Sequence, residues 1–431
     1  MHKSKEEAQE AAVDKTVSAL IEKALARSAT DIHIEPRANS IVVRFRVDGW
    51  LQETAKLPLP ALTALVRNLK KRADLDVEAH NTPQNGRFQF DSEQLRTEVR
   101  VAIMPTVTGE KIALHLARYL SEPATLASLG YWGDALNRVE TAVAEPHGLI
   151  IVSSLDRTGV NMSLLGVLHL LNNPALNIAT LEDPIEHQIA GISQTQVSAA
   201  AGISFSTGLQ ALLHQDPNVV MVSDLHEADT VRVAIHAALN GRLIMGGLHA
   251  ADAAHGAAHL LHMHVEPFLV ASSLRLSIGQ RFVRRLCPSC RQAYTPDESA
   301  RKDLRTLLRA TGITSVKALH ELEQTAAKHG LNGDDAPHLN TTEKTITRLY
   351  RANTEGCPHC RFSGYSGRLG ICEVLVTSDT MKKRIAENGD ASTIRKVAVQ
   401  EGMIPLQLDG LVKALRGLTS VEEILPLALA S

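Results

Sequence analysis

Long apolar runs, net charge and cysteines are all scarce in this sequence of 431 residues, and each shortage excludes a class of protein. No apolar run approaches the roughly 20 residues that span a bilayer, and the N-terminal segment lacks the apolar core of a signal peptide. The formal charge is only −2, so no overall basic field indicates nucleic-acid binding. Five cysteines, four of them in two CxxC pairs, fit a reducing compartment and a metal better than a disulfide framework. We therefore predict a cytoplasmic protein of roughly two to three domains.

The N-terminal part has the pattern of a small α+β unit. A charged amphipathic helix is expected over about 5–27, because apolar residues recur there at helical spacing. Residues 31–35 and 41–47 alternate with period two, as strands do, and Asp48-Gly49 favours a turn after them. One further helix and three further strands follow, near 60–73, 86–91, 95–103 and 111–116.

The middle of the chain has a different pattern. Helical segments alternate there with short apolar runs at 149–152, 177–181, 219–222 and 242–245. Such alternation predicts a parallel sheet with helices on both faces. The predicted boundaries are 1–120 for the N-terminal α+β domain, 121–135 for a linker, 136–285 for the α/β domain, 286–376 for a cysteine-bearing subdomain with a polar helical insert, and 377–431 for a C-terminal helical region.

An apolar run at 148–152, a polar turn and a helical run at 162–171 follow one another in the order of a phosphate-binding loop. The motif G-x-x-x-x-G-K-[ST] needs glycines for close backbone approach, a lysine for the outer phosphates and a hydroxyl for Mg²⁺. Positions 154, 159, 160 and 161 instead hold Ser, Gly, Val and Asn, so only Gly159 matches. Val160 offers no charge, and an amide is a poor substitute for a hydroxyl at Mg²⁺. The candidate nucleotide-binding residues are Ser154, Asp156, Arg157, Thr158, Gly159, Val160 and Asn161.

Loss of these groups predicts weak catalysis. Removing one preorganised contact to a transferring phosphoryl group costs about 100- to 1,000-fold in rate, and here several are missing together. Asp156 adds a negative charge where a nucleotide would sit, and Arg157 offsets it only in part, because a loop arginine is not aimed as a helix-borne lysine is.

The cysteine pairs are Cys287 with Cys290 and Cys357 with Cys360. Two intervening residues let one turn present both sulfurs to a tetrahedral Zn²⁺, and two such turns make a closed, structural four-thiolate site. The alternative is four reduced thiols without a metal. Cys372 lies in an apolar, strand-like context and is predicted to be a buried core residue.

Many segments, in order along nearly the whole chain, resemble the secretion ATPase superfamily, the assembly ATPases of type II secretion and type IV pili. The similar segments are 28–36 (its SDIHIEP element), 83–87 (PQDGR), 109–111 (GEK), 180–186 (aspartate box), 215–222 (Walker B strand), 248–249 (histidine box), 280–290 (zinc element), and 402–403, 409–410 and 420–423 (C-terminal helices).

This resemblance implies a RecA-like P-loop NTPase domain preceded by a smaller α+β domain, with a tetracysteine zinc subdomain and a helical C-terminal tail. It implies Glu182, Asp224 and His249 as catalytic positions, with ATP and Mg²⁺ as ligands. It also implies a ring, normally hexameric, that docks on platform proteins of the inner membrane and binds no nucleic acid. The additional N-terminal domain that tethers some type II members to the membrane complex is expected to be absent.

The sequence departs from the family around the nucleotide. The Walker B glutamate falls at Asp224, whose carboxylate is one methylene shorter. Positions where the family has basic residues hold Gln210, His214 and His226 near that strand and His80, Asn81 and His115 in the N-terminal domain.

Several of these residues have other interpretations. Glu182 and Asp183 are consistent with a cap at the end of a strand, His249 with a hydrogen-bonded interior histidine, and Gly159 with a simple turn. The cluster His255, His259, His262 and His264 has the i, i+4 spacing of metal ligands, but no nearby carboxylate or cysteine is expected to complete a set.

Two functions compete. In the first, the protein is a weak or noncatalytic homologue that acts as a scaffold or regulator, in a ring of its own or in a mixed ring with an active paralogue. In the second, it is an active ATPase that powers pilus or pseudopilus assembly and secretion, using Arg157, Glu182, Asp224 and His249. The missing lysine favours the first, whereas analogy of fold favours the second.

Overall fold

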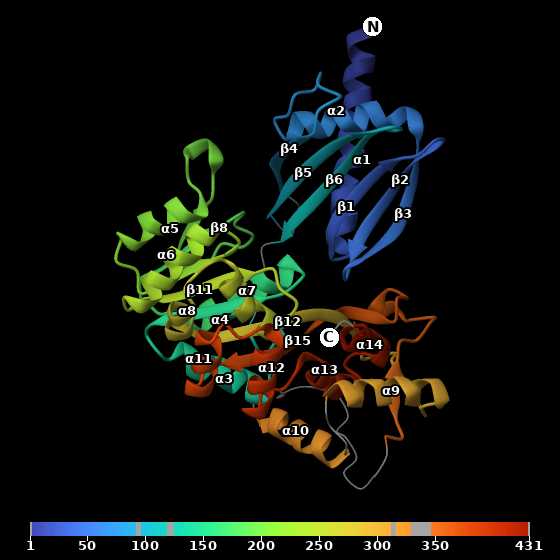
Figure 1. The fold of residues 1–431 in the computed structure, drawn as a ribbon. Helices are drawn as coiled ribbons and strands as arrows, with labels where there is room; N and C mark the ends of the chain where they lie inside the picture. Colours follow the sequence, from blue (N-terminus) through green and yellow to red (C-terminus); the bar gives the residue numbers. More distant parts are fainter. Residues whose placement is uncertain (1, 92–95, 119–124, 312–315, 329–345, 430–431) are drawn as a thin grey trace. The chain divides into compact units, whose positions relative to one another are not determined.

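The computed structural model describes residues 2–91, 96–118, 125–311, 316–328 and 346–429, and these form two compact units (Figure 1). Unit 1 comprises Met1–Ser121 with Glu186–Gln188, and unit 2 comprises Glu122–Ile185 with Ile189–Ser431. Part of the predicted linker, 121–124, lies outside the described residues. Among the described helices, none combines the length and apolar character that crossing a bilayer requires.

Unit 1 is an antiparallel sheet of order β3-β2-β1-β6-β5-β4, and its two helices pack on one face of that sheet. Its buried core takes the alternate residues of the strands, among them Ile32 and Ile34, together with a stripe of the first helix that includes Val17 and Ile21. The predicted α+β unit is thereby confirmed. Its elements are α1 His2–Ala26, β1 Ala29–Pro36, β2 Ser40–Val47, β3 Trp50–Pro58, α2 Leu62–Arg72, β4 Gln84–Asp91, β5 Arg96–Thr106 and β6 Gly109–Arg118.

The face of the unit 1 sheet opposite its helices bears charged side chains, and Glu35 is at their centre. Its carboxylate accepts hydrogen bonds from Arg44 at 2.6 Å and Arg37 at 2.9 Å and forms an ion pair with Lys111 at 3.0 Å. Burial alone would raise the pKa of Glu35, but Arg44 and Lys111 lower it from 4.5 to about 2. The folded state therefore favours the ionised carboxylate.

This pKa shift predicts an acid-dependent loss of stability. Because the unfolded chain binds more protons between the two pKa values, the contribution of Glu35 is complete above pH 4.5 and is lost as the pH falls toward 2. We expect a loss of roughly 2 kcal/mol, since solvent screens the partly exposed cations. Chemical unfolding of the wild type and of Glu35→Gln, followed across this pH range, measures it. A difference between the two proteins that stays constant from neutral to acidic pH would contradict this assignment.

Unit 2 is built on a seven-stranded sheet of order β15-β12-β7-β11-β10-β8-β9. Neighbouring strands are parallel except for the pair β12 and β15. Helices α3 and α4 pack on one face, and α5 to α8 pack on the other. The elements of this layered part are α3 Gly133–Val143, β7 Gly148–Ser153, α4 Arg157–Leu171, β8 Ile178–Glu182, β9 Ser193–Gln196, α5 Phe205–Leu213, β10 Val219–Val222, α6 Ala228–Leu239, β11 Leu243–Leu248, α7 Ala253–His262, α8 Pro267–Ser273, β12 Leu274–Leu286 and β15 Tyr365–Val376.

The parallel strands are apolar throughout because both faces of the sheet are covered. All residues of β7, β8, β10 and β11 are buried, which explains why their sequences show continuous apolar runs instead of alternation. The predicted parallel sheet with helices on both faces is confirmed. The sequence interpretation grouped 365–376 with the cysteine-bearing subdomain, but β15 pairs along β12 and its residues 369–375 are buried in the main sheet.

The cysteine-bearing segment and the C-terminal region are mostly helical. Helices α9, α13 and α14 share a core that includes Leu307, Leu411 and Ile424. The predicted helical insert and C-terminal helical tail are both present among the described residues, and 329–345 of the insert lie outside them. The elements are β13 Gln292–Tyr294, α9 Glu298–Thr311, α10 Val316–Lys328, β14 Leu349–Arg351, α11 Asp379–Ala386, α12 Ala391–Gln400, α13 Leu406–Leu415 and α14 Val421–Leu429.

Candidate functional site

The candidate site residues of unit 2 lie at one edge of its sheet. The carboxyl ends of parallel strands meet at the same edge, where open α/β sheets bind ligands. Ser154 follows β7, Glu182 ends β8, Asp224 follows β10 and His249 follows β11. The order of these strands in the sheet brings together the segments that were predicted to be catalytic and nucleotide-binding.

Helix α4 begins earlier than the sequence pattern indicated. The apolar run predicted a helix over 162–171, but α4 starts at Arg157, and Asp156 is its N-cap. The Asp156 side chain accepts a hydrogen bond from the Thr158 amide at 3.1 Å, which satisfies a free N–H group of the first turn. Asp residues are favoured at this position, so the residue interpreted as a charge facing a nucleotide is also the residue that begins the helix.

Four backbone amides of this turn, those of Asp156, Thr158, Gly159 and Val160, donate hydrogen bonds within the chain. The amides of Gly159 and Val160 donate to the Asp156 carbonyl oxygen at 3.0 and 3.3 Å. The Asp156 amide donates to Ser154 Oγ at 3.1 Å. In a phosphate-binding loop, such amides point at the anion; here the chain's own oxygens accept their hydrogen bonds.

Two ion pairs hold the loop in place. Arg157 Nη2 contacts Asp224 Oδ2 at 3.0 Å, and His226 lies 3.3 Å from the other carboxylate oxygen. Arg368, on β15, lies 3.6 Å from Asp156. Arg157 was expected to offset part of the charge of Asp156, but its ion pair is with Asp224, the predicted Walker B position. No local sequence pattern indicates the contact of Arg368 with Asp156, because the two residues are over 200 positions apart in the chain.

The other predicted catalytic positions, Glu182 and His249, differ in their surroundings. Glu182 is buried and accepts hydrogen bonds from Thr180 at 2.6 Å and Gln194 at 2.9 Å, so the fold holds it at the end of β8. His249 is exposed. Its interpretation as an interior histidine is therefore wrong, and the reason is that the buried strand β11 ends at Leu248, one residue earlier.

Val160 and Asn161 point into the protein. Val160 is 4% exposed, and a Cβ on Gly247 of β11 would lie 2.5 Å from its Cγ1, so the two segments are in close contact. The Asn161 side-chain oxygen is buried without a hydrogen-bond partner. Val160 is thus buried, and it makes an apolar contact where the motif would have a lysine.

Gly159 has a packing role of its own. A Cβ at this position would lie 2.2 Å from Oε1 of Gln280, a fully buried residue of β12. A side chain at position 159 would therefore force the Gln280 amide to move. Gly159 thus has a packing role that needs no phosphate.

We therefore expect Gly159→Ala to destabilise unit 2 by about 1–3 kcal/mol, the usual cost of overpacking. The same substitution in a Gln280→Ala background should cost less, because the opposing side-chain amide is gone. Chemical unfolding of the four proteins measures the coupling. Equal costs in both backgrounds would show that Gln280 does not impose the glycine.

The four cysteines form a second candidate site. The Sγ atoms of Cys287 and Cys357, of Cys290 and Cys360, and of Cys357 and Cys360 are each 3.7 Å apart. All four ligand atoms lie within 4.8 Å of one another. A tetrahedron with Zn–S bonds of about 2.3 Å has edges of about 3.8 Å, so this arrangement fits a zinc ion. Cys372 is 1% exposed, which confirms its predicted burial.

Backbone amides support a thiolate at this site. Burial opposes ionisation of Cys360, but the amides of Cys357 and Gly364 donate to its Sγ, each at 3.2 Å, and lower its pKa to about 6. Burial and the neighbouring cysteines raise the pKa of Cys290. One thiolate thus forms readily, and a dication would stabilise the others.

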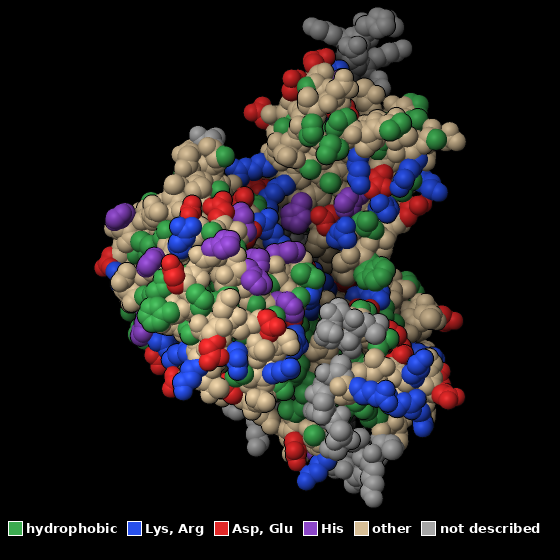
Figure 2. Space-filling view, in the orientation of Figure 1, with side chains coloured by type: hydrophobic (Ala, Val, Ile, Leu, Met, Phe, Trp, Pro, Cys, Tyr) green, Lys and Arg blue, Asp and Glu red, His purple; other side chains and the backbone are tan. Residues whose placement is uncertain are grey.

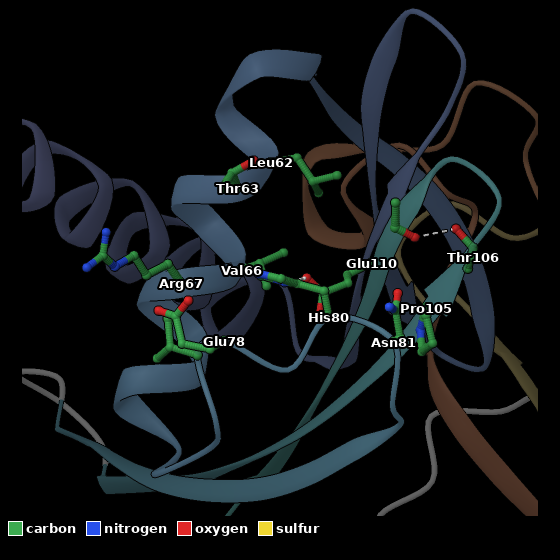
Figure 3. A pocket seen from close by; sticks show the side chains of 12 residues that line it. Leu62, Thr63, Val66, Arg67, Glu78, His80, Asn81, Pro105, Thr106 and Glu110 are labelled. Carbon is green, nitrogen blue, oxygen red and sulfur yellow. Dashed lines mark hydrogen bonds and ion pairs between the residues drawn. The ribbon is translucent and has the colours of Figure 1, made fainter.

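Unit 1 contains a pocket of about 550 Å³ between α2, the 77–81 loop and the turn between β5 and β6 (Figure 3). His80, one of the residues that replace a basic pair, lies in it with its Nδ1 2.9 Å from Glu110. Glu110 also pairs with the fully buried Lys70 at 2.7 Å, and Lys70 donates to the Ala79 carbonyl. These contacts fix the 77–81 loop, so the polar wall of the pocket has a structural role.

Known proteins of similar sequence give independent information on the family. The chain matches the family described as Type II/IV secretion system protein over residues 6–426. It is 34% identical over 419 residues to the type IV pilus assembly ATPase PilB of Thermus thermophilus. The aligned region covers 97% of this chain and 43% of that protein. It is 32% identical over 421 residues to the putative type II secretion system protein E of Escherichia coli, covering 98% and 78%. The chain thus spans less than half of the Thermus relative.

The fold has solved counterparts. The ATPase DotB of Legionella pneumophila is similar with a TM-score of 0.63 at 15% identity, over 95% of this chain and 94% of that one. This likeness concerns the fold, and it confirms the RecA-like domain with a smaller N-terminal domain. With a family match over nearly its whole length, the chain belongs to the type II/IV secretion system protein family.

Proposed function

We propose that this protein is a member of the type II secretion and type IV pilus assembly ATPase family whose nucleotide site is degenerate, and that it acts as a scaffold or regulator of the machine. The observation that carries the proposal is the Asp156 carboxylate on the N-terminus of α4, where a phosphate would bind. The residues of this loop do not fit a nucleoside triphosphate, because they offer it a negative charge and few free amides.

The charges around the loop support the same conclusion. A triphosphate needs a cation at the start of the helix, and Val160 provides none. Arg157 is paired with Asp224, so moving it to a phosphate would leave that carboxylate without its partner. Each lost contact costs about 100- to 1,000-fold in rate. We infer that hydrolysis is absent or vestigial.

In the proposed role, the protein retains the family's ring-forming and partner-docking surfaces but does not hydrolyse ATP. The protein forms a ring, either hexameric with copies of itself or mixed with an active paralogue. It works on the cytoplasmic side of the inner membrane, docked on platform proteins of a secretion or pilus system. The four cysteines hold a structural Zn²⁺ that maintains the fold of the segment between β12 and β15.

Turnover of Mg-ATP by the purified protein tests the proposal. We expect no release of phosphate above that of Asp224→Ala, in the presence of saturating nucleotide. Titration with a fluorescent ATP analogue separates binding from hydrolysis, and we expect no saturable binding. Turnover at several per second that disappears in Asp224→Ala would overturn the proposal.

The second candidate is an active ATPase that powers assembly. Two observations favour it: the relatives from Thermus thermophilus and Escherichia coli bear names of assembly ATPases or secretion proteins, and Glu182 is retained in a defined hydrogen-bonded position. In that case Arg157 would leave Asp224 for the phosphates. Arg157→Ala should then abolish ATP turnover. Under the first proposal, phosphate release stays at the same background level with and without this substitution.

A further inference from the structure

The exposed surface of α7 carries histidines at the spacing of one helix face. His255, His259 and His262 are four and three positions apart, so they lie beside one another along the helix. His255 and His262 are exposed, and His259 is half-buried. Figure 2 shows histidine side chains gathered over the region that Figure 1 labels α7. None of these histidines belongs to the nucleotide loop or to the four-cysteine site.

A buried carboxylate holds the first of these histidines. His255 Nδ1 lies 2.7 Å from Asp252 Oδ2, and Asp252 is only 7% exposed, whereas the His255 side chain is 53% exposed. A carboxylate accepts hydrogen bonds, so Nδ1 carries the hydrogen and the neutral ring keeps a lone pair on Nε2. Asp252 is itself fixed, because it caps α7 through the His255 amide at 2.9 Å and pairs with Arg395.

This contact corrects the sequence interpretation. No carboxylate was expected near the histidines, yet Asp252 is hydrogen-bonded to one of them. Asp252 is placed to orient a ligand and not to be one. Metal-binding histidines usually donate their second ring N–H to such a group, which fixes the tautomer and makes the free nitrogen more basic.

We propose that the exposed face of α7 binds a divalent transition-metal ion through His255 Nε2 and the imidazole of His259, with His262 as a third ligand. Imidazoles suit zinc, nickel and copper, whereas magnesium and calcium prefer oxygen ligands. With two or three protein ligands, coordination positions remain open for water or for a side chain of another molecule. The site differs in chemistry from the four thiolates, which close the coordination of their ion.

The imidazoles converge by rotation of their side chains. Among the described residues, only the cysteine cluster already has three or more ligand atoms within 4.8 Å of one another. Exposed side chains change rotamer within picoseconds to nanoseconds. His255 needs the least adjustment, because Asp252 already sets its ring. His264 follows the end of the helix and is not part of the proposed set.

Calorimetric titration with Ni²⁺ tests the proposal, using the full chain without a histidine tag and with its cysteine site first saturated with zinc. We expect one Ni²⁺ per chain with a micromolar Kd and no heat with Mg²⁺. His255→Ala and His259→Ala should each weaken binding at least about tenfold, the scale of ligand-shell losses. His169→Ala, an exposed histidine in the last turn of α4, is the matched control and should bind as the wild type does.

A second variant tests the orienting role of Asp252. Asp252→Asn retains an oxygen for the helix cap and removes the charge that holds His255, and we expect about 10- to 100-fold weaker binding of Ni²⁺. The wild type binding no Ni²⁺, or both histidine variants binding it as tightly as the wild type, would overturn the proposal. The result of these Ni²⁺ titrations is independent of ATP turnover, since none of these residues lies in the nucleotide loop.

Discussion

Chelating the metal from the four-cysteine site is expected to unfold the segment that carries the two cysteine pairs. Structural zinc contributes about 10–16 kcal/mol of binding free energy in small zinc-binding peptides, and apart from the cysteines the residues at 288–293 and 351–363 are all exposed or half-buried. Its two strands, β13 and β14, pair over three residues each. We expect one zinc per chain by elemental analysis, and faster hydrogen exchange over 287–294 and 349–364 once a chelator has removed it.

The effect should remain local. Leu304 and Leu307 of α9 pack in the same core as Leu411 of α13, so the insert has an apolar attachment that does not depend on the metal. Cys357→Ser should lose the zinc, and Cys372→Ser provides the control, because this buried cysteine of β15 is not part of the cluster. A Cys357→Ser protein that retains a full equivalent of zinc would contradict the assignment.

Local sequence patterns predicted the parts of the fold that depend on the burial of nearby residues. The runs at 149–152 and 219–222 predicted parallel strands because a strand covered on both faces has no polar side. The CxxC spacing predicted that the four sulfurs would meet, since each pair lies within one turn. In both cases the physical cause lies within a few residues of its effect.

Contacts between distant segments left no such pattern. Nothing in the sequence around Asp156 indicates that Arg368 will lie beside it, or that Gln280 will lie against Gly159. The start of α4 was missed for a different reason. The sequence allows two interpretations of Asp156, as a charge that faces a ligand or as a helix N-cap. The hydrogen bond that its side chain accepts from the Thr158 amide identifies it as the N-cap.

Lys413→Met is expected to destabilise unit 2 by about 3–5 kcal/mol, the cost of removing one partner from a buried ion pair. Lys413 is fully buried on α13. Its ammonium group donates to Asp409 at 2.6 Å and to the carbonyl oxygens of Gly130 and Gly370 at 2.7 and 2.8 Å. It also lies 4.6 Å from the centre of the Trp132 ring. One side chain thereby joins the first residues of unit 2 to β15 and to the C-terminal helices.

The pH dependence of this loss identifies its cause. Burial raises the pKa of Asp409 and Lys413 lowers it, so in Lys413→Met the folded-state pKa rises further above its unfolded value. The native state then binds more protons than the unfolded chain, and stability falls as the pH rises through that interval. We therefore expect the cost of Lys413→Met to be larger at neutral than at acidic pH.

The double variant Lys413→Met, Asp409→Asn separates the buried charge from lost packing. The asparagine keeps an oxygen for the Cys372 amide, which donates to Asp409 at 2.9 Å, and it carries no charge. If the unpaired carboxylate is what destabilises Lys413→Met, the double variant should regain much of the stability and lose the pH dependence. A double variant as unstable as the single one at every pH would instead assign the cost to the two carbonyl groups, and Lys413 would then act as a hydrogen-bonding clamp and not as a counter-ion.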